Sequence, residues 1–157
     1  LVIYFTKILE AVAMAEKDTA QLEHDLKAAD DVKKFDEENA ENFRQYTLAE
    51  YLQKLLAEKN LSKAQVIKDS QLEEIYAHHI FGGRKNTSRE YILSLAVAMK
   101  LTPKETDYLL YYGKHKKLYV RDRWDEVIFF ALENGLNVLE TNELLHDMNL
   151  SPLLGSL

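Results

Sequence analysis

Three side chains between residues 74 and 79 are of types that could bind a metal ion: Glu74, His78 and His79. A carboxylate and an imidazole four positions apart lie on one face of a helix, so Glu74 and His78 could share an ion. His79 points about 100° away from His78 and cannot join them. Because two side chains are too few ligands, we predict no metal site, and we interpret the histidines as facing solvent or a partner.

Acidic side chains are plentiful, but their pattern does not indicate catalysis. The chain has no cysteine, no glycine-rich phosphate loop ahead of a helix and no nucleophile elbow. Its carboxylates fall at helix-capping positions and on polar helix faces, where acid–base groups do not converge. We therefore predict that the protein is not an enzyme and uses no cofactor. The lack of cysteine is typical of a reducing compartment, so we predict a cytoplasmic location.

Basic residues concentrate in two segments, "GGRKN" at 82–86 and "GKHKKLYVRDR" at 113–123. The two glycines would let the side chains that follow them approach a phosphate backbone closely. The second segment has two interpretations, a solvated connector between helices or a further phosphate contact. The net charge of −6 argues against a protein that simply coats nucleic acid.

Capping signals predict the helices that position these residues. A small polar residue followed three positions later by an acid or amide satisfies backbone donors at a helix start. Such pairs begin at Thr47, Ser62, Thr87, Thr102 and Asn137, with Asp122 as a weaker acidic version. Left-handed helix ends are predicted at Asn60, Gly82-Gly83, Gly113 and Gly135. The resulting helices cover residues 48–59, 63–70, 73–81, 88–100, 103–112, 123–134 and 138–148.

An additional helix is predicted near the start of the chain, where apolar residues recur at helical spacing in an acidic segment: Leu22, Leu26, Ala29, Val32 and Phe35. The preceding apolar segment, 1–15, is shorter than the roughly 20 residues that span a bilayer. We predict that it docks on the body of the protein or on a partner.

Two stretches of the sequence resemble each other. Residues 87–110 overlay 122–145 after a shift of 35 positions, with similar apolar residues and caps. Such a period is typical of one helical hairpin used twice, and convergence of two hairpins on similar caps and spacing is the alternative.

Few prolines and glycines favour an all-α fold, because the sequence offers little material for sheet turns. We predict three parts: an acidic N-terminal helical arm at 1–46, a helix-turn-helix domain at 47–113 and a C-terminal helical extension at 114–157. Within the second part, Ser62 caps a short helix and residues 70–72 form a turn with Leu72 buried. The next helix presents Tyr76, Ala77 and Ile80 to the core.

Residues 48–110 resemble the lambda-repressor-like, Cro/cI-type (XRE) helix-turn-helix domain, most clearly in "LSKAQVI", "IFGGRKN" and "LAVAMKLT". The segment "YVRDRWDEVIFFALENGLNVLETNELL" resembles the C-terminal extension of a bacterial subgroup of these regulators. The resemblance implies a lambda-repressor-like domain followed by a helical hairpin. It also implies a sequence-specific transcriptional regulator that binds double-stranded DNA, an operator, as a homodimer.

The resemblance also implies roles for particular residues. Recognition-helix residues near or at base edges would be Glu74, Ile75, His78 and His79. Residues near DNA phosphates would be Lys63, Glu73, Arg84, Lys85 and Asn86.

Two features of the sequence depart from the family. Gln71 occupies a turn position where the family usually has glycine, and Glu73 and Glu74 replace polar or basic residues. One glutamate could accept a hydrogen bond from cytosine N4, but two oppose the attraction to phosphates. The alternative function is therefore a degenerate helix-turn-helix that acts as a protein–protein adaptor. Its acidic arm or residues 73–79 would meet a basic partner, with Ile75 as an anchor.

Overall fold

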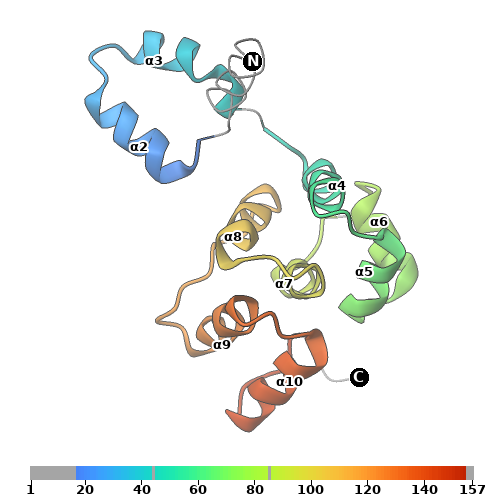
Figure 1. The fold of residues 1–157 in the computed structure, drawn as a ribbon. Coiled ribbons are helices and arrows are strands. Elements are labelled where there is room, and N and C mark those ends of the chain that lie inside the picture. Colours follow the sequence, from blue (N-terminus) through green and yellow to red (C-terminus); the bar gives the residue numbers. More distant parts are fainter. Residues whose placement is uncertain (1–16, 44, 85, 155–157) are drawn as a thin grey trace, which may run out of the picture. The chain divides into compact units, whose positions relative to one another are not determined.

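The described part of the chain is helical, as the sequence predicts. The computed structural model describes residues 17–43, 45–84 and 86–154, and no strand occurs within these ranges. The helices are α2 (Thr19–Ala28), α3 (Val32–Glu38), the 3-10 helix η1 (Ala40–Phe43), α4 (Leu48–Glu58), α5 (Lys63–Ser70), α6 (Glu74–Phe81), α7 (Arg89–Ala98), α8 (Pro103–Tyr112), α9 (Arg123–Glu133) and α10 (Val138–Asp147) (Figure 1). None of the helices in the described ranges is long and apolar enough to cross a membrane. The segment 1–15 lies outside the described residues.

The chain divides into two compact units, residues 1–45 and 46–157. In the first unit, the prediction of one continuous helix through residues 22–35 is wrong. Ala29 is extended, with ψ of 134°, and Asp31 starts a new helix by accepting a hydrogen bond from the Lys33 N–H at 2.9 Å. Aspartate is favoured at the N-cap of a helix and disfavoured in a helix interior. The segment therefore forms two helices, α2 and α3.

The predicted helix-capping residues in the second unit are confirmed with one exception. Thr47, Thr102 and Asn137 form complete capping boxes, in which side chain and backbone satisfy each other. The predicted cap at Thr87 is wrong, because Ser88 accepts the hydrogen bond from the Tyr91 N–H instead. The hydroxyl of Thr87 is buried and turned toward α6.

Helix ends follow the prediction less closely. Asn60, Gly83 and Gly135 have the left-handed conformation, as predicted. Gly113 does not: its φ is −79°, and the next residue, Lys114, is left-handed with φ of 61°. The presence of glycine at position 113 has a steric explanation instead, since a Cβ atom added there would lie 2.3 Å from Cδ1 of Ile92.

The core of the second unit is organised around α7. Six consecutive residues of this helix, from Ile92 to Val97, are buried on all sides. Helices α5, α8, α9 and α10 all contact α7, which lies at the centre of the second unit in Figure 1. The C-terminal hairpin therefore shares one hydrophobic core with α4–α8.

The hairpins α7–α8 and α9–α10 make equivalent contacts 35 positions apart. Asp107 Oδ1 accepts a hydrogen bond from the Leu118 N–H at 2.9 Å, and Asn142 Oδ1 accepts one from the Leu153 N–H at 2.7 Å. A buried threonine in each hairpin donates its hydroxyl to the carbonyl of the N-cap residue. The sequence similarity between the hairpins thus extends to their three-dimensional contacts, including the segment that follows each second helix.

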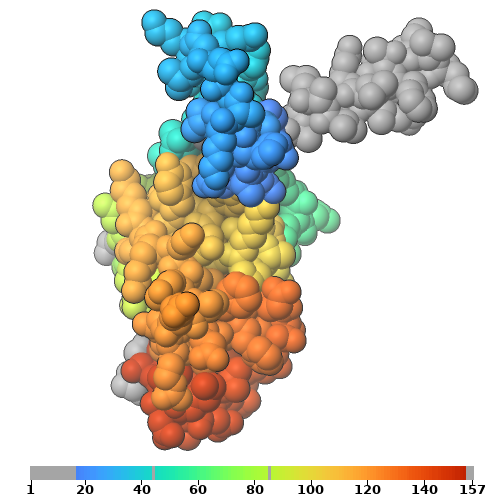
Figure 2. All heavy atoms as spheres, turned by 90° about the vertical axis from the view of Figure 1, so that its left-hand side faces the viewer, coloured from blue at the N-terminus to red at the C-terminus, as the bar shows by residue number. Residues whose placement is uncertain are grey.

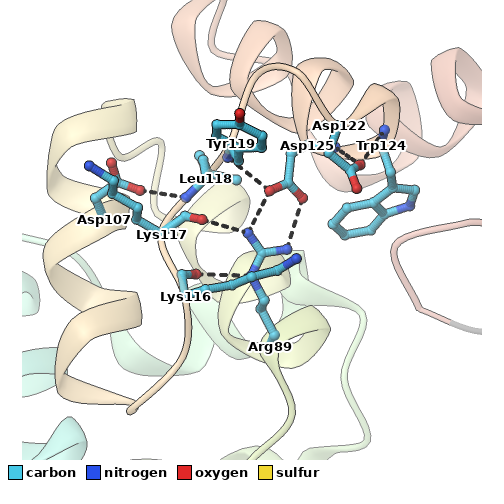
Figure 3. Close-up of polar contacts among 9 residues, drawn as sticks. All are labelled: Arg89, Asp107, Lys116, Lys117, Leu118, Tyr119, Asp122, Trp124 and Asp125. Atoms are coloured by element: carbon cyan, nitrogen blue, oxygen red, sulfur yellow. Dashed lines mark hydrogen bonds and ion pairs between the residues drawn. The ribbon is translucent and has the colours of Figure 1, made fainter.

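An ion pair joins the two hairpins (Figure 3). Arg89 donates hydrogen bonds from both terminal nitrogens to the carboxylate of Asp125, at 2.8 and 2.7 Å. Burial alone would raise the pKa of Asp125, but hydrogen bonds from Arg89 and the Tyr119 N–H, together with the positive charge of Arg89, hold that pKa below its ordinary value. Asp125 therefore stays charged and links α7, α9 and the chain between α8 and α9.

Candidate nucleic-acid interface

Helices α5 and α6 are joined by a tight turn that Ser70 and Gln71 organise. Ser70 is fully buried, and its hydroxyl donates to the Ile67 carbonyl at 2.6 Å and accepts from the Leu72 N–H at 3.3 Å. Gln71 has φ of 60° and ψ of 14°, which is the left-handed conformation. Leu72 is half-buried and packs against the core. The turn geometry is therefore achieved without glycine.

Replacing Gln71 by glycine is expected to raise the free energy of unfolding by up to about 1 kcal/mol. Relief of the left-handed strain stabilises the fold by roughly 1–2 kcal/mol, and the greater freedom of glycine in the unfolded chain offsets part of that gain. Urea unfolding followed by circular dichroism measures the change. A loss of stability would show that the exposed glutamine side chain supports the turn through contacts of its own.

The inner face of α6 is fixed in the core as predicted. Ala77 and Ile80 are 0% and 1% exposed, and Tyr76 is half-buried with its ring at 5.1 Å from the ring of Tyr91 in α7. Phe81 is also buried, at the C-terminal end of the helix. These contacts fix the rotation of α6 about its axis and thereby decide which residues reach solvent.

The outer face of α6 presents the residues predicted to approach bases. Glu74, Ile75 and His78 are exposed, and Ile75 is 66% exposed although it is a large apolar residue. His79 is half-buried. His78 Nε2 lies 3.9 Å from Glu74 Oε1, so the two side chains share one side of the helix. The face combines acceptors, donors and an apolar group, the features that base-edge contacts require.

Glu73 caps α6 instead of forming its first helical turn. Its carboxylate oxygens accept hydrogen bonds from the N–H groups of Ile75 and Tyr76, at 3.1 and 2.8 Å. The side chain is consequently turned back onto the helix, where it occupies donors that could otherwise hold an anion. Glu73 therefore has a structural role that its position in the sequence did not indicate.

The loop after α6 exposes polar residues at the end of the helix. Gly83 is left-handed with φ of +75°, and the Arg84 N–H donates to the His79 carbonyl at 2.9 Å. The side chains of Arg84 and Asn86 are exposed, whereas Lys85 lies outside the described residues. Arg84 and Asn86 are thus brought to the C-terminal end of α6, next to the exposed face of that helix.

Lys63, at the start of α5, is half-buried and lies near the end of α6. Its Nζ atom is 5.6 Å from the centroid of the Phe81 ring, a cation–π distance. The ammonium group is therefore placed on the side of the molecule where α6 ends and the Arg84 loop begins.

A hydrogen-bonded link behind the Arg84 loop was not predicted. The Tyr76 hydroxyl donates to Thr87 Oγ1 at 3.4 Å, and His115 Nε2 lies 2.7 Å from the Thr87 carbonyl oxygen. Thr87 thereby joins α6 to the chain that follows α8. The positions of Tyr76, Thr87 and His115 in the sequence follow no repeat of a single helix or hairpin. No periodic pattern could therefore have identified the link.

The described residues include no group of three or more histidine, cysteine or acidic side chains arranged to hold a metal ion. Comparison with protein-family models, curated protein sequences and solved structures gives no match to this chain.

Proposed function

We propose that residues 61–86 form a lambda-repressor-like helix-turn-helix and that the protein is a cytoplasmic, sequence-specific DNA-binding transcriptional regulator of the Cro/cI (XRE) type. The observation that carries the proposal is the outer face of α6, where Glu74, Ile75 and His78 are exposed on a helix whose opposite face is locked in the core. Arg84 and Asn86 flank that face on a loop built by Gly83.

In this arrangement α6 enters the major groove and its outer residues contact base edges. A glutamate at position 74 would accept a hydrogen bond from cytosine N4, and Ile75 would contact a thymine methyl group. Lys63, Arg84, Lys85 and Asn86 would contact phosphates and fix the register. Because one recognition helix reads few base pairs, we propose that the protein binds a two-fold operator as a homodimer, without catalysis or a cofactor.

A protein–protein adaptor is the second candidate, and the exposed Ile75 favours it. An apolar side chain that is 66% exposed beside a carboxylate suits a contact with a basic protein surface. The acidic N-terminal segment 1–46, with 11 acidic and 6 basic residues, would add to such a contact.

Reversal of the charge at Glu74 separates the two candidates. Glu74 is exposed and is not the cap of α6, so Glu74→Lys leaves the helix start intact. If DNA lies against α6, we expect about 3- to 10-fold tighter binding to a generic 30-base-pair duplex at low salt, because a repulsive charge becomes attractive. Fluorescence anisotropy of a labelled duplex measures the affinity.

Glu133→Lys is the matched control, since Glu133 is exposed on α9 and gives the same change in net charge. Equal effects of the two substitutions would place the duplex away from α6 and favour the adaptor.

A further inference from the structure

We propose that the basic connection, residues 113–122 between α8 and α9, is a second contact for the phosphate backbone of double-stranded DNA. The inference rests on the proposed function and extends its contact surface beyond the helix-turn-helix. Lys114, Lys116 and Lys117 carry the charge, and all three side chains are exposed. Such contacts supply affinity and fix the register of a protein on a duplex without reading its sequence.

The backbone of the basic connection is held by hydrogen bonds from three helices (Figure 3). Arg89 of α7 donates to the carbonyl oxygens of Lys116 and Lys117, at 3.0 and 3.1 Å. Carboxylates of α8 and α9 accept the next two backbone N–H groups, each at 2.9 Å. Because the backbone is already fixed, less conformational entropy is lost when the lysines engage a ligand.

The basic connection adjoins the predicted phosphate-contacting loop. His115 lies 2.7 Å from the carbonyl oxygen of Thr87, the residue directly after Asn86. Figure 2 shows yellow-green residues, the colour of the chain around α6 and the loop after it, next to light-orange residues of α8 and the chain that follows it. The segment that carries the exposed lysines therefore adjoins the loop that carries Arg84 and Asn86, so one duplex can meet both segments.

The repeated hairpin shows that the fold does not require these lysines. The segment after α10 has the same left-handed residue at its start, with φ of 57° at Asn149, and its Leu153 N–H makes the equivalent hydrogen bond. Ser151 and Pro152 occupy the positions that correspond to Lys116 and Lys117. The contacts are therefore conserved between the hairpins while the charge is present in only one, which indicates a role outside the fold.

The positive charge of the basic connection lies on exposed side chains. Arg89 is neutralised by the buried carboxylate of Asp125 at 2.7 Å. Lys114, Lys116 and Lys117 are exposed, and the charge of Lys116 also helps to lower the pKa of Asp125. The net positive charge on this surface therefore comes from the lysines and not from the ion pair beneath them.

The test is the salt dependence of duplex binding by a variant with Lys114→Gln, Lys116→Gln and Lys117→Gln. A labelled 30-base-pair duplex is titrated with the full chain across a range of potassium chloride concentrations. We expect the slope of the logarithm of the binding constant against the logarithm of salt to become shallower by about 2 to 3, from the loss of three phosphate contacts. The variant with Lys27→Gln, Lys33→Gln and Lys34→Gln, exposed in the first unit, gives the same charge change and should keep the wild-type slope.

The outcomes distinguish this inference from the proposed function. If the wild-type protein binds the duplex and both triple variants share its slope, the basic connection makes no phosphate contact and the inference is overturned while the proposed function stands. If both variants lose slope equally, the lysines act only through net charge, which also overturns the inference. If the wild-type protein binds no duplex even at low salt, the proposed function fails and the inference fails with it.

Discussion

Substitution of Arg89 by methionine is expected to lower the free energy of unfolding of the second unit by about 3 to 5 kcal/mol. The Asp125 side chain is 2% exposed, and Arg89 supplies two of its hydrogen bonds. Methionine keeps much of the side-chain length but leaves a buried carboxylate without its cation. The carbonyl oxygens of Lys116 and Lys117 lose their donor at the same time. Urea unfolding monitored by circular dichroism measures the loss.

A double-mutant cycle provides the control for the Arg89 prediction. Asp125→Asn removes the charge while its amide oxygen can still accept from the Tyr119 N–H. The double variant should be less destabilised than the two single changes added together, because neither partner then remains as an unpaired buried charge. If Arg89→Met lowered the free energy of unfolding by less than about 1 kcal/mol, the result would contradict a buried ion pair that stabilises the fold, since exposed pairs contribute that little.

Acid unfolding of the Asp125→Asn variant provides a second test of the ion pair between Arg89 and Asp125. The pKa of Asp125 is lowered in the folded state by the hydrogen bonds and charge of Arg89, which outweigh the effect of burial. The resulting stabilisation is fully present above the unfolded pKa of about 3.9 and is lost as the pH falls through the folded pKa. Asp125→Asn should therefore show a shallower loss of stability in this acidic range than the wild-type protein.

The substitution Gly113→Ala is expected to destabilise the second unit by about 1 to 3 kcal/mol through overpacking. The backbone does not cause the loss, since φ of −79° at Gly113 suits alanine. The added Cβ would lie 2.3 Å from Cδ1 of Ile92, whose side chain is fully buried and has few alternative positions. Thermal and urea unfolding of the single variant measure the change.

The Ile92→Val background tests this steric explanation directly. Valine lacks the Cδ1 atom and should by itself destabilise the protein by about 0.5 to 1.5 kcal/mol. Adding Gly113→Ala to that background should then have little further effect, because the methyl group fills the vacated space. Additive losses in the double variant would mean that Gly113 is required for a reason other than its contact with Ile92.

The local features of the fold were predictable because their causes lie within a few residues. Thr47, Thr102 and Asn137 start helices through hydrogen bonds to residues three positions later. The exposed face of α6 followed from helical periodicity in the same way. The Asp30-Asp31 pair also carried a local signal for the break between α2 and α3, although apolar spacing favoured a continuous helix.

Two errors in the second unit, at Thr87 and Gly113, arose where tertiary contacts decided between local alternatives. Thr87 and Ser88 are both suitable caps, and Ser88 takes the role because Thr87 is buried between α6 and the basic connection. Gly113 resembled a left-handed helix end, but its neighbour Ile92 is 21 positions away in the sequence. The pair of Arg89 with Asp125, 36 positions apart, likewise has no pattern by which it could be recognised.

Selection of the purified protein against a random library of DNA duplexes tests the central claim most directly. Selection starts at low salt and is repeated at physiological salt, so that attraction to phosphates alone is removed. We predict enrichment of a two-fold symmetric motif that persists at physiological salt, as expected for a homodimer whose α6 helices read base edges. Weak binding that salt abolishes, with no enriched motif, would contradict sequence-specific DNA recognition by this protein.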